Sequence, residues 1–178
     1  DITRNNDGSV LVQVYKITKE GEKSKKVYER KFDPADTKEI RLYAMGGDDK
    51  FVTHGDGNKI KIRMIGGSGN DVFESNAASP AGKNLAYDLN TETNQVTGNI
   101  RQKLSDDPAV NKYEMLYYKY NFNIPFVSVG YNPDDGLFLG VSFKMIRHGF
   151  RKTPYKSSQQ CIVNHSLSTK AYNFRYYG

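Results

Sequence analysis

Three aspartates beside two glycine-rich turns are the residues of this chain best suited to binding a metal ion. One turn is Gly46-Gly47-Asp48-Asp49, and the other is Gly66-Gly67-Ser68-Gly69-Asn70-Asp71. Calcium takes about six to eight oxygen ligands, from carboxylates and from backbone carbonyls, and glycine turns expose their carbonyls freely. The two turns therefore predict a calcium site with these ligands: Asp48, Asp49, Gly67, Gly69 and Asp71.

A second interpretation of the same residues needs no metal, because Asp and Asn brace turns and glycine supplies the positive φ that turns require. The turn that begins at Gly66 resembles the repeat G-G-x-G-x-D-x-U of the calcium-binding β-rolls of RTX proteins. The turn that begins at Gly46 resembles it only as a degenerate copy. Asp49 and Asp71 lie 22 residues apart (71 − 49), not at twice the nine-residue repeat. That spacing counts against a regular calcium site, and both interpretations stay open.

Short strands must position these turns. Residues 59–64 alternate strictly, which predicts a strand with an inward apolar face made of Ile60, Ile62 and Met64. Phe51 and Phe73 follow the two turns at matching offsets and are expected in the same core. The predicted fold class is mainly β, with a short-strand β-roll-like or small β-sandwich domain followed by long antiparallel hairpin strands. At most one short helix is expected, beginning at Asp107-Pro108.

Longer alternating strands follow residue 122. One strand carries five apolar residues on one face, with mostly small or polar residues on the other: Leu137, Leu139, Val141, Phe143 and Met145. Residues 172–176 alternate in the same way. Strands of about ten residues with one apolar face are typical of transmembrane barrels. An ordinary half-exposed soluble sheet has the same period, so periodicity does not decide between the two.

Residues 30–43 and 130–152, together with the two glycine turns, resemble segments of Bacteroidetes-type outer-membrane proteins of the bacterial surface antigen family. That family is related to the barrel-assembly factors. Some of its members carry an N-terminal calcineurin-like metallophosphoesterase domain and a C-terminal transmembrane barrel. The resemblance covers nearly the whole chain, but it is carried by running sequence and not by a catalytic motif.

The resemblance implies a domain organisation. Residues 1–104 are expected to form a β domain that precedes the barrel, with its glycine and aspartate turns at 44–76. Residues 105–121 are expected to be a linker with a short helix, and 122–178 the opening strands of the barrel, cut off early. This places the chain in the outer membrane or cell envelope.

The sequence contains no complete catalytic constellation. The phosphoesterase signatures Asp-x-His, Gly-Asp and Gly-Asn-His are not found as a set, and the three histidines lack the spacing of metal ligands. A single cysteine, Cys161, excludes an internal disulfide and a thiolate zinc site. The net charge of +6 is spread along the predicted strands and not massed on a helix. We therefore expect neither enzymatic activity nor a nucleic-acid partner.

Three functions fit these observations. We favour a non-catalytic β module of an outer-membrane barrel protein that serves assembly, transport or anchoring, with calcium as a possible stabilising ion. Its C-terminal strands would contact the membrane, and their exposed edges would allow self-association. The second function is an accessory C-terminal region of a cell-envelope metallophosphoesterase. The third is a soluble calcium-binding or adhesive surface module.

Overall fold

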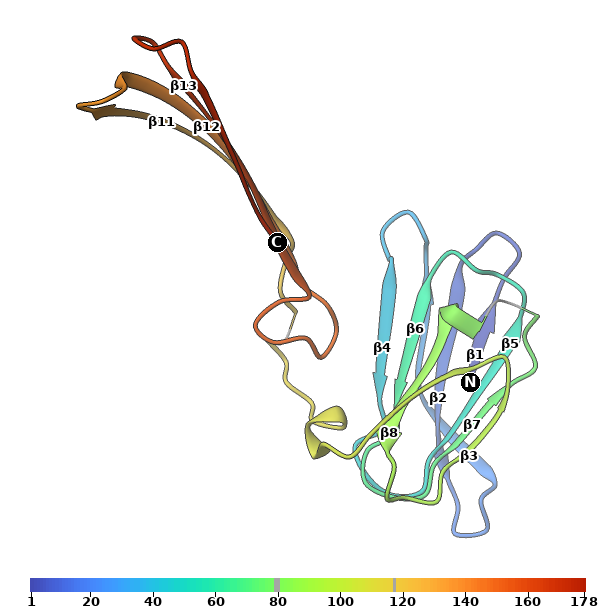
Figure 1. Cartoon of the computed structure of the whole chain (residues 1–178). Helices are drawn as coiled ribbons and strands as arrows, with labels where there is room; N and C mark the ends of the chain where they lie inside the picture. Colours follow the sequence, from blue (N-terminus) through green and yellow to red (C-terminus); the bar gives the residue numbers. More distant parts are fainter. Residues whose placement is uncertain (79–80, 117) are drawn as a thin grey trace. The chain divides into compact units, whose positions relative to one another are not determined.

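The computed structural model describes residues 1–78, 81–116 and 118–178, and these are mainly β-strand (Figure 1), which confirms the predicted fold class. The chain divides into two units, a coil unit (Asp1–Tyr113) and a meander unit (Glu114–Gly178). Among the described residues, no helix is long and apolar enough to cross a membrane.

The coil unit winds the chain back and forth between two sheets. Four strands form one sheet in the order β10-β8-β6-β4: β4 (Glu39–Tyr43), β6 (Lys61–Ile65), β8 (Asn84–Leu89) and β10 (Arg101–Ser105). Three strands that alternate with them along the chain lie in the other sheet: β5 (Lys50–Gly55), β7 (Val72–Ser75) and β9 (Gln95–Gly98). All neighbours within these two sets pair in parallel, so each coil contributes one strand to each sheet.

The coils are 22 or 23 residues long where the turns stack. Glu39 pairs with Lys61 and Lys50 pairs with Val72, an offset of 22 residues in each case (61 − 39 and 72 − 50). Val72 then pairs with Gln95, an offset of 23 (95 − 72). The 22-residue spacing that counted against a regular site is therefore the length of one coil, and it places Asp49 beside Asp71.

The N-terminal residues extend the second sheet. β1 (Ile2–Arg4) pairs in parallel with β5 and antiparallel with β2 (Val10–Ile17), which forms a hairpin with β3 (Lys23–Phe32). The sheet order is therefore β3-β2-β1-β5-β7-β9.

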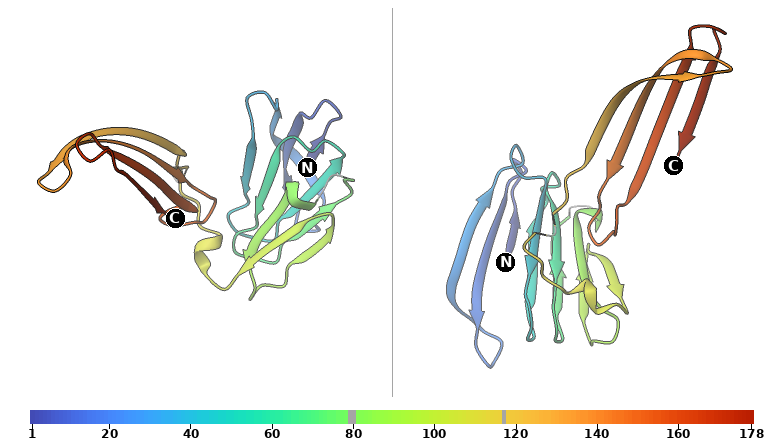
Figure 2. Two further views of the ribbon diagram at one scale, coloured as in Figure 1. Left: turned by 45° about the horizontal axis from the view of Figure 1, so that its top comes forward. Right: turned by 90° about the vertical axis from the view of Figure 1, so that its left-hand side faces the viewer.

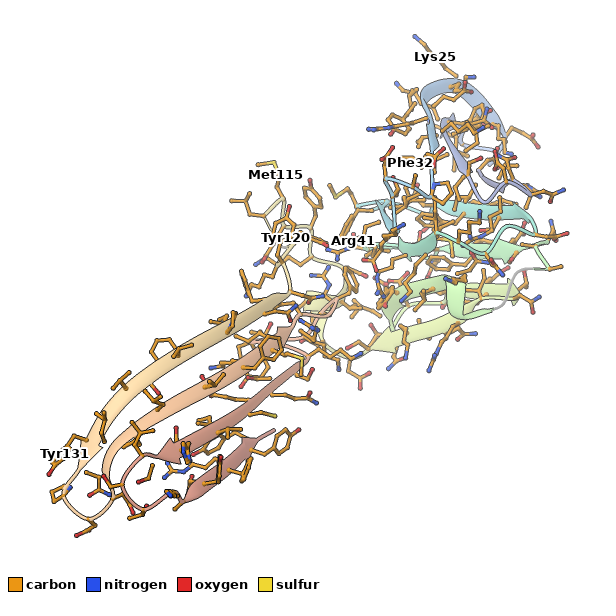
Figure 3. The ribbon with its side chains drawn as sticks, turned by 90° about the horizontal axis from the view of Figure 1, so that it is seen from above. Lys25, Phe32, Arg41, Met115, Tyr120 and Tyr131 are labelled. Atoms are coloured by element: carbon orange, nitrogen blue, oxygen red, sulfur yellow. The ribbon has the colours of Figure 1, made fainter. Side chains whose placement is uncertain are left out.

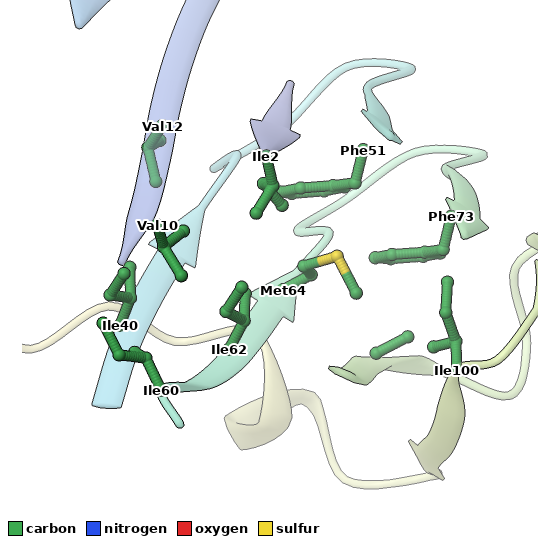
Figure 4. Close-up of a cluster of buried hydrophobic side chains, with 11 residues drawn as sticks. Ile2, Val10, Val12, Ile40, Phe51, Ile60, Ile62, Met64, Phe73 and Ile100 are labelled. Carbon is green, nitrogen blue, oxygen red and sulfur yellow. The ribbon is translucent and has the colours of Figure 1, made fainter. Parts of the chain in front are cut away.

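Apolar side chains from both sheets fill the coil (Figure 4). The inward residues predicted for β6 and the segment before it, Ile60, Ile62 and Met64, are fully buried. Phe51 and Phe73 are register partners, and their rings stack 5.1 Å apart with an interplanar angle of 1°. Phe51 and Phe73 follow the two turns at equal offsets, and they contact each other because stacked coils place equivalent residues side by side.

Helix within the described residues is confined to two single 3-10 turns, η1 (Ala81–Lys83) and η2 (Pro108–Val110), where the sequence predicted at most one short helix. Asp107 caps η2 by accepting a hydrogen bond from the Ala109 amide at 2.9 Å. Residues 95–98 and 101–105, which carry no clear pattern, form β9 and β10.

The meander unit is one antiparallel sheet in the order β11-β12-β13-β14, curved along its length (Figure 2). Its strands are β11 (Phe122–Asn132), β12 (Gly136–Arg147), β13 (Ser157–Ser166) and β14 (Tyr172–Tyr177). Tyr131 lies near the end of β11, beside the turn to β12 (Figure 3). β13 contains Cys161, which lies in a polar, strand-like run of the sequence.

The stacked phenylalanines provide a test of the coil core. Phe73→Ala removes a fully buried ring and should lower the free energy of unfolding of the coil unit by about 3–5 kcal/mol. Val27→Ala, on exposed β3, should change it by no more than about 0.5 kcal/mol. Hydrogen exchange of peptides from β4 to β8 at increasing urea reports this unit alone. Equal losses in the two variants would contradict the assignment of the core.

Candidate functional site

The turns that carry the predicted calcium ligands stack on one another at one end of the coil. Asp48 accepts a hydrogen bond through Oδ1 from the Asn70 amide at 2.8 Å, and Asp71 accepts one through Oδ1 from the Asp49 amide at 2.8 Å. One coil further on, Asn94 Oδ1 accepts from the Asp71 amide at 2.7 Å. Each of these side chains therefore braces the neighbouring coil, which is the turn-forming role considered above.

The two predicted glycine ligands are held in place by backbone geometry. Gly67 and Gly69 have φ values of +107° and +144°, a region that glycine adopts readily. A Cβ on Gly67 would meet the Met45 carbonyl oxygen at 2.4 Å, and one on Gly69 would meet the Gly47 carbonyl oxygen at the same distance. Their role in the structure is thus the close stacking of adjacent turns.

The second oxygen of Asp71 has a different environment from the first. Asp71 and Asp88 are both 0% exposed, and within the described residues neither Oδ2 has a hydrogen-bond partner. A Cβ built on Gly66 would stand 2.0 Å from Asp71 Oδ2 and 2.1 Å from Asp88 Oδ2. The two carboxylates therefore converge on the space that glycine leaves open.

Two further side chains complete this group, which we call the acid–amide cluster (Asp71, Asp88, Glu92 and Asn111). Asn111 Nδ2 donates to Asp88 Oδ1 at 2.8 Å and also to the Gly67 carbonyl. Glu92 Oε1 accepts from the Gly69 amide at 3.3 Å. Glu92 Oε2 and Asn111 Oδ1 are buried and, in the part of the chain described, unpartnered.

Burial perturbs the acids of this cluster. It raises the pKa of Asp71, an effect that the charges of Asp49 and Glu92 reinforce, whereas the hydrogen bond from the Asp49 amide and the contact with the Asp88 side chain oppose it. Burial likewise raises the pKa of Asp88, as does its contact with Asp71, against the hydrogen bond from Asn111 and the contact with Glu92. The pKa of Glu92 is raised by burial and by its contact with Asp88. Burial is the largest cause of all three shifts, because negative charge is unfavourable there without a counter-charge.

Three members of the cluster were not predicted as site residues. Only Asp71 is common to the predicted set, whereas Asp48 is exposed and Asp49 is partly buried outside the cluster. The 22-residue coil length could have indicated Asp88, because it aligns Asp88 with Gly66 (88 − 66). As their side chains stand, no three Asp, Glu, His or Cys residues among those described form a metal-binding group.

The other end of the coil holds a buried cation that is fully satisfied. Arg4 is 2% exposed and donates to the carbonyls of Gly57, Ile60 and Lys83 at 2.9–3.0 Å and to Asn84 Oδ1. Burial lowers its pKa to about 10. The guanidinium thus joins β1 to the turns beside it, and its hydrogen bonds mark it as structural. Arg4 therefore differs from the acid–amide cluster, in which buried oxygens have no hydrogen-bond partner among the described residues.

The meander unit carries the second candidate site, a surface that we call the apolar face. Directly paired residues point to the same side of an antiparallel sheet. The register therefore places these exposed residues together: Val127, Val129, Tyr131, Leu137, Leu139, Val141, Phe143, Val163, Tyr172, Phe174 and Tyr176. The opposite face mixes small and polar residues, such as Ser128, Ser142 and Asn164, with a few apolar ones. Phe138 is one of these, and its ring covers Gly130.

The remaining reactive residues do not assemble into a site. His54 is exposed on β5, and the Nδ1 of His148 lies 2.7 Å from the Tyr120 carbonyl oxygen, which accepts the hydrogen bond between them. His165 stacks on Tyr172 with ring centroids 4.4 Å apart, and Cys161 is exposed.

No family model matches the chain, and neither a curated protein nor a solved structure matches it. The resemblance to the surface antigen family therefore stays a prediction.

The raised pKa values predict how stability depends on pH. A group whose folded pKa is raised contributes stability below its unfolded pKa, about 4 for Asp and Glu, and this is lost as pH rises through the folded value. In chelator, the coil unit should therefore lose this contribution between acidic and neutral pH. Asp88→Asn removes one of the carboxylates that repel one another in the cluster. The free energy of unfolding of this variant, relative to that of the native chain, should therefore increase with pH. Urea unfolding read by hydrogen exchange in β5–β8 measures the difference, and a pH-independent difference would contradict the shifts.

Proposed function

We propose that this chain is a non-catalytic β module of an outer-membrane barrel protein, to which the meander unit contributes membrane-embedded strands. The apolar face is the observation that carries the proposal. Its eleven residues form rows across all four strands, and each of them is more than a third exposed. Soluble proteins rarely leave a contiguous apolar surface of this kind uncovered.

The dimensions of the strands support a membrane location. β11, β12 and β13 contain 11, 12 and 10 residues, and a transmembrane strand needs about 9–11. From the Tyr131 row to the Phe143 row, the apolar face contains no Asp, Glu, Lys or Arg among the described residues. The charged side chains of Lys144 and Arg175 lie on the opposite face, which would line the interior of a barrel.

The two edges of the meander also favour a larger sheet. Within residues 118–178, β11 pairs with β12 alone and β14 pairs with β13 alone. Backbone groups at an open edge have no water to bind in a lipid environment, so a membrane sheet must close on further strands. In this proposal those strands come from a longer chain, and in their absence a second copy would pair at the edges.

The coil unit would serve assembly, transport or anchoring and not catalysis. Several of its buried polar residues brace turns or belong to the acid–amide cluster, and the Ser9 hydroxyl, which donates to Asp7, braces the turn before β2. The predicted resemblance to the surface antigen family is consistent with this role. A β domain of this kind would stand outside the membrane, in the cell envelope.

A pair of matched substitutions on β12 tests the membrane proposal. Val141 lies on the apolar face and its neighbour Ser142 on the opposite face. The full chain should float with phosphatidylcholine vesicles in a density gradient. Val141→Arg should reduce the bound fraction more than tenfold, since an arginine facing lipid near the midplane costs about 2–4 kcal/mol. Ser142→Arg should bind as the unsubstituted chain does.

Two outcomes would contradict the proposal. If the unsubstituted chain stays with the soluble fraction, the apolar face does not bind lipid, and the soluble-module hypothesis becomes the better one. If both variants lose binding equally, the attraction does not depend on which face carries the charge. Circular dichroism of each variant ensures that the comparison is made between folded chains.

A further inference from the structure

We infer that the acid–amide cluster binds a divalent cation of the calcium type, with Asp71, Asp88, Glu92 and Asn111 as side-chain ligands. This site is distinct from the one that the glycine turns predict, and it shares only Asp71 with it. The inference concerns the coil unit alone and does not rest on a membrane role for the meander.

The unpartnered oxygens are the first argument. Buried polar groups are nearly always hydrogen-bonded, and a buried charge without a partner is strongly unfavourable. Here four buried oxygens from four side chains, all within one end of the coil, lack a partner among the described residues. Two of them, on the fully buried Asp71 and Asp88, point at the same space above Gly66. A cation bound between these two oxygens would satisfy both carboxylates at once.

The second argument is the position of Asn111, which is neutral and lies outside the repeating coils. Its Nδ2 is fixed by Asp88 Oδ1 and the Gly67 carbonyl, so the direction of its side chain is set. Its Oδ1 remains available. An amide oxygen beside carboxylates is a common calcium ligand. An ionised carboxylate carries no proton, so it cannot donate a hydrogen bond to this oxygen.

The chemistry of the donors selects the class of ion. All four atoms are oxygens, which are the ligands that calcium and magnesium prefer, and no thiolate or imidazole of the described residues is part of the cluster. Calcium tolerates irregular geometry, whereas magnesium requires a near-octahedral arrangement and retains water. Since Asp71 and Asp88 are buried and Glu92 lies on a turn, the irregular set favours calcium. Glu92, on the turn after β8, supplies the remaining side-chain ligand.

Binding would have a structural consequence beyond the coils. Asn111 directly follows η2, in the segment that leads to the meander unit. A cation bound by Asp71 and Asp88 from the coils and by Asn111 from this segment would fasten residues 108–113 to the coils that precede them.

Calorimetric titration of the full chain with calcium chloride, in a mild non-ionic detergent at neutral pH, tests the inference. We expect a dissociation constant of about 10⁻³ M or below. Asp88→Asn should weaken binding about tenfold or more, because it removes a charged ligand. This variant should remain folded, since its new amide can donate to Asp71 Oδ2. Asp48→Asn is the matched control and should leave the affinity within about twofold, because Asp48 is exposed and outside the cluster.

Hydrogen exchange gives an independent readout. Calcium should slow exchange in peptides covering residues 105–113 and 88–94, and Asp88→Asn should abolish this protection. Loss of binding in Asp48→Asn but not in Asp88→Asn would overturn the inference in favour of a site in the glycine turns. No heat and no protection with either calcium or magnesium would also overturn it, and the two aspartates would then share a proton. Neither result depends on whether the meander binds lipid.

Discussion

The equal length of successive coils is the constraint on which the coil unit depends. Because the offset is 22 residues, equivalent positions of neighbouring coils become direct neighbours, and in several pairs like residues meet, as Ile40 and Ile62 do. Phe51 therefore stacks on Phe73 in the core, while Asp49 lies beside Asp71 in the turns. The same register that builds the core brings carboxylates together, and glycine at position 66 provides the space into which two of them point.

The meander unit follows a different rule. Its strands alternate as regularly as those of the coil, but its apolar face has no second sheet against it within residues 118–178. In the coil, two sheets cover each other and water remains outside. Under the proposed function lipid covers this face, whereas the opposite face mixes Ser, Asn, Lys and Arg with apolar residues such as Phe126.

The sequence predicted what depends on local period, and it missed what depends on contacts between coils. The strict alternation of residues 59–64 identified the core strand, and Asp107-Pro108 identified the start of η2. Residues 95–105 were not assigned, because polar strands of a coil are specified by stacking more than by their own pattern. Asp88 and Asn111 were missed as site residues because Asp88 lies within an ordinary strand and Asn111 directly follows η2, and their convergence with Asp71 depends on coil length. Burial of Arg4 carried no signal at all, since arginine is usually exposed.

Hydrogen exchange of the full chain, with and without phospholipid vesicles, tests most directly whether the two units depend on different surroundings. The backbone amides of β4–β8 should exchange equally slowly in buffer and in vesicles, because the coil core is already complete in water. Those of β11–β14 should exchange much more slowly in vesicles, where lipid covers the apolar face and the strand edges are paired. Equal protection of β11–β14 in both conditions would contradict the account, because the meander would then be complete without a membrane.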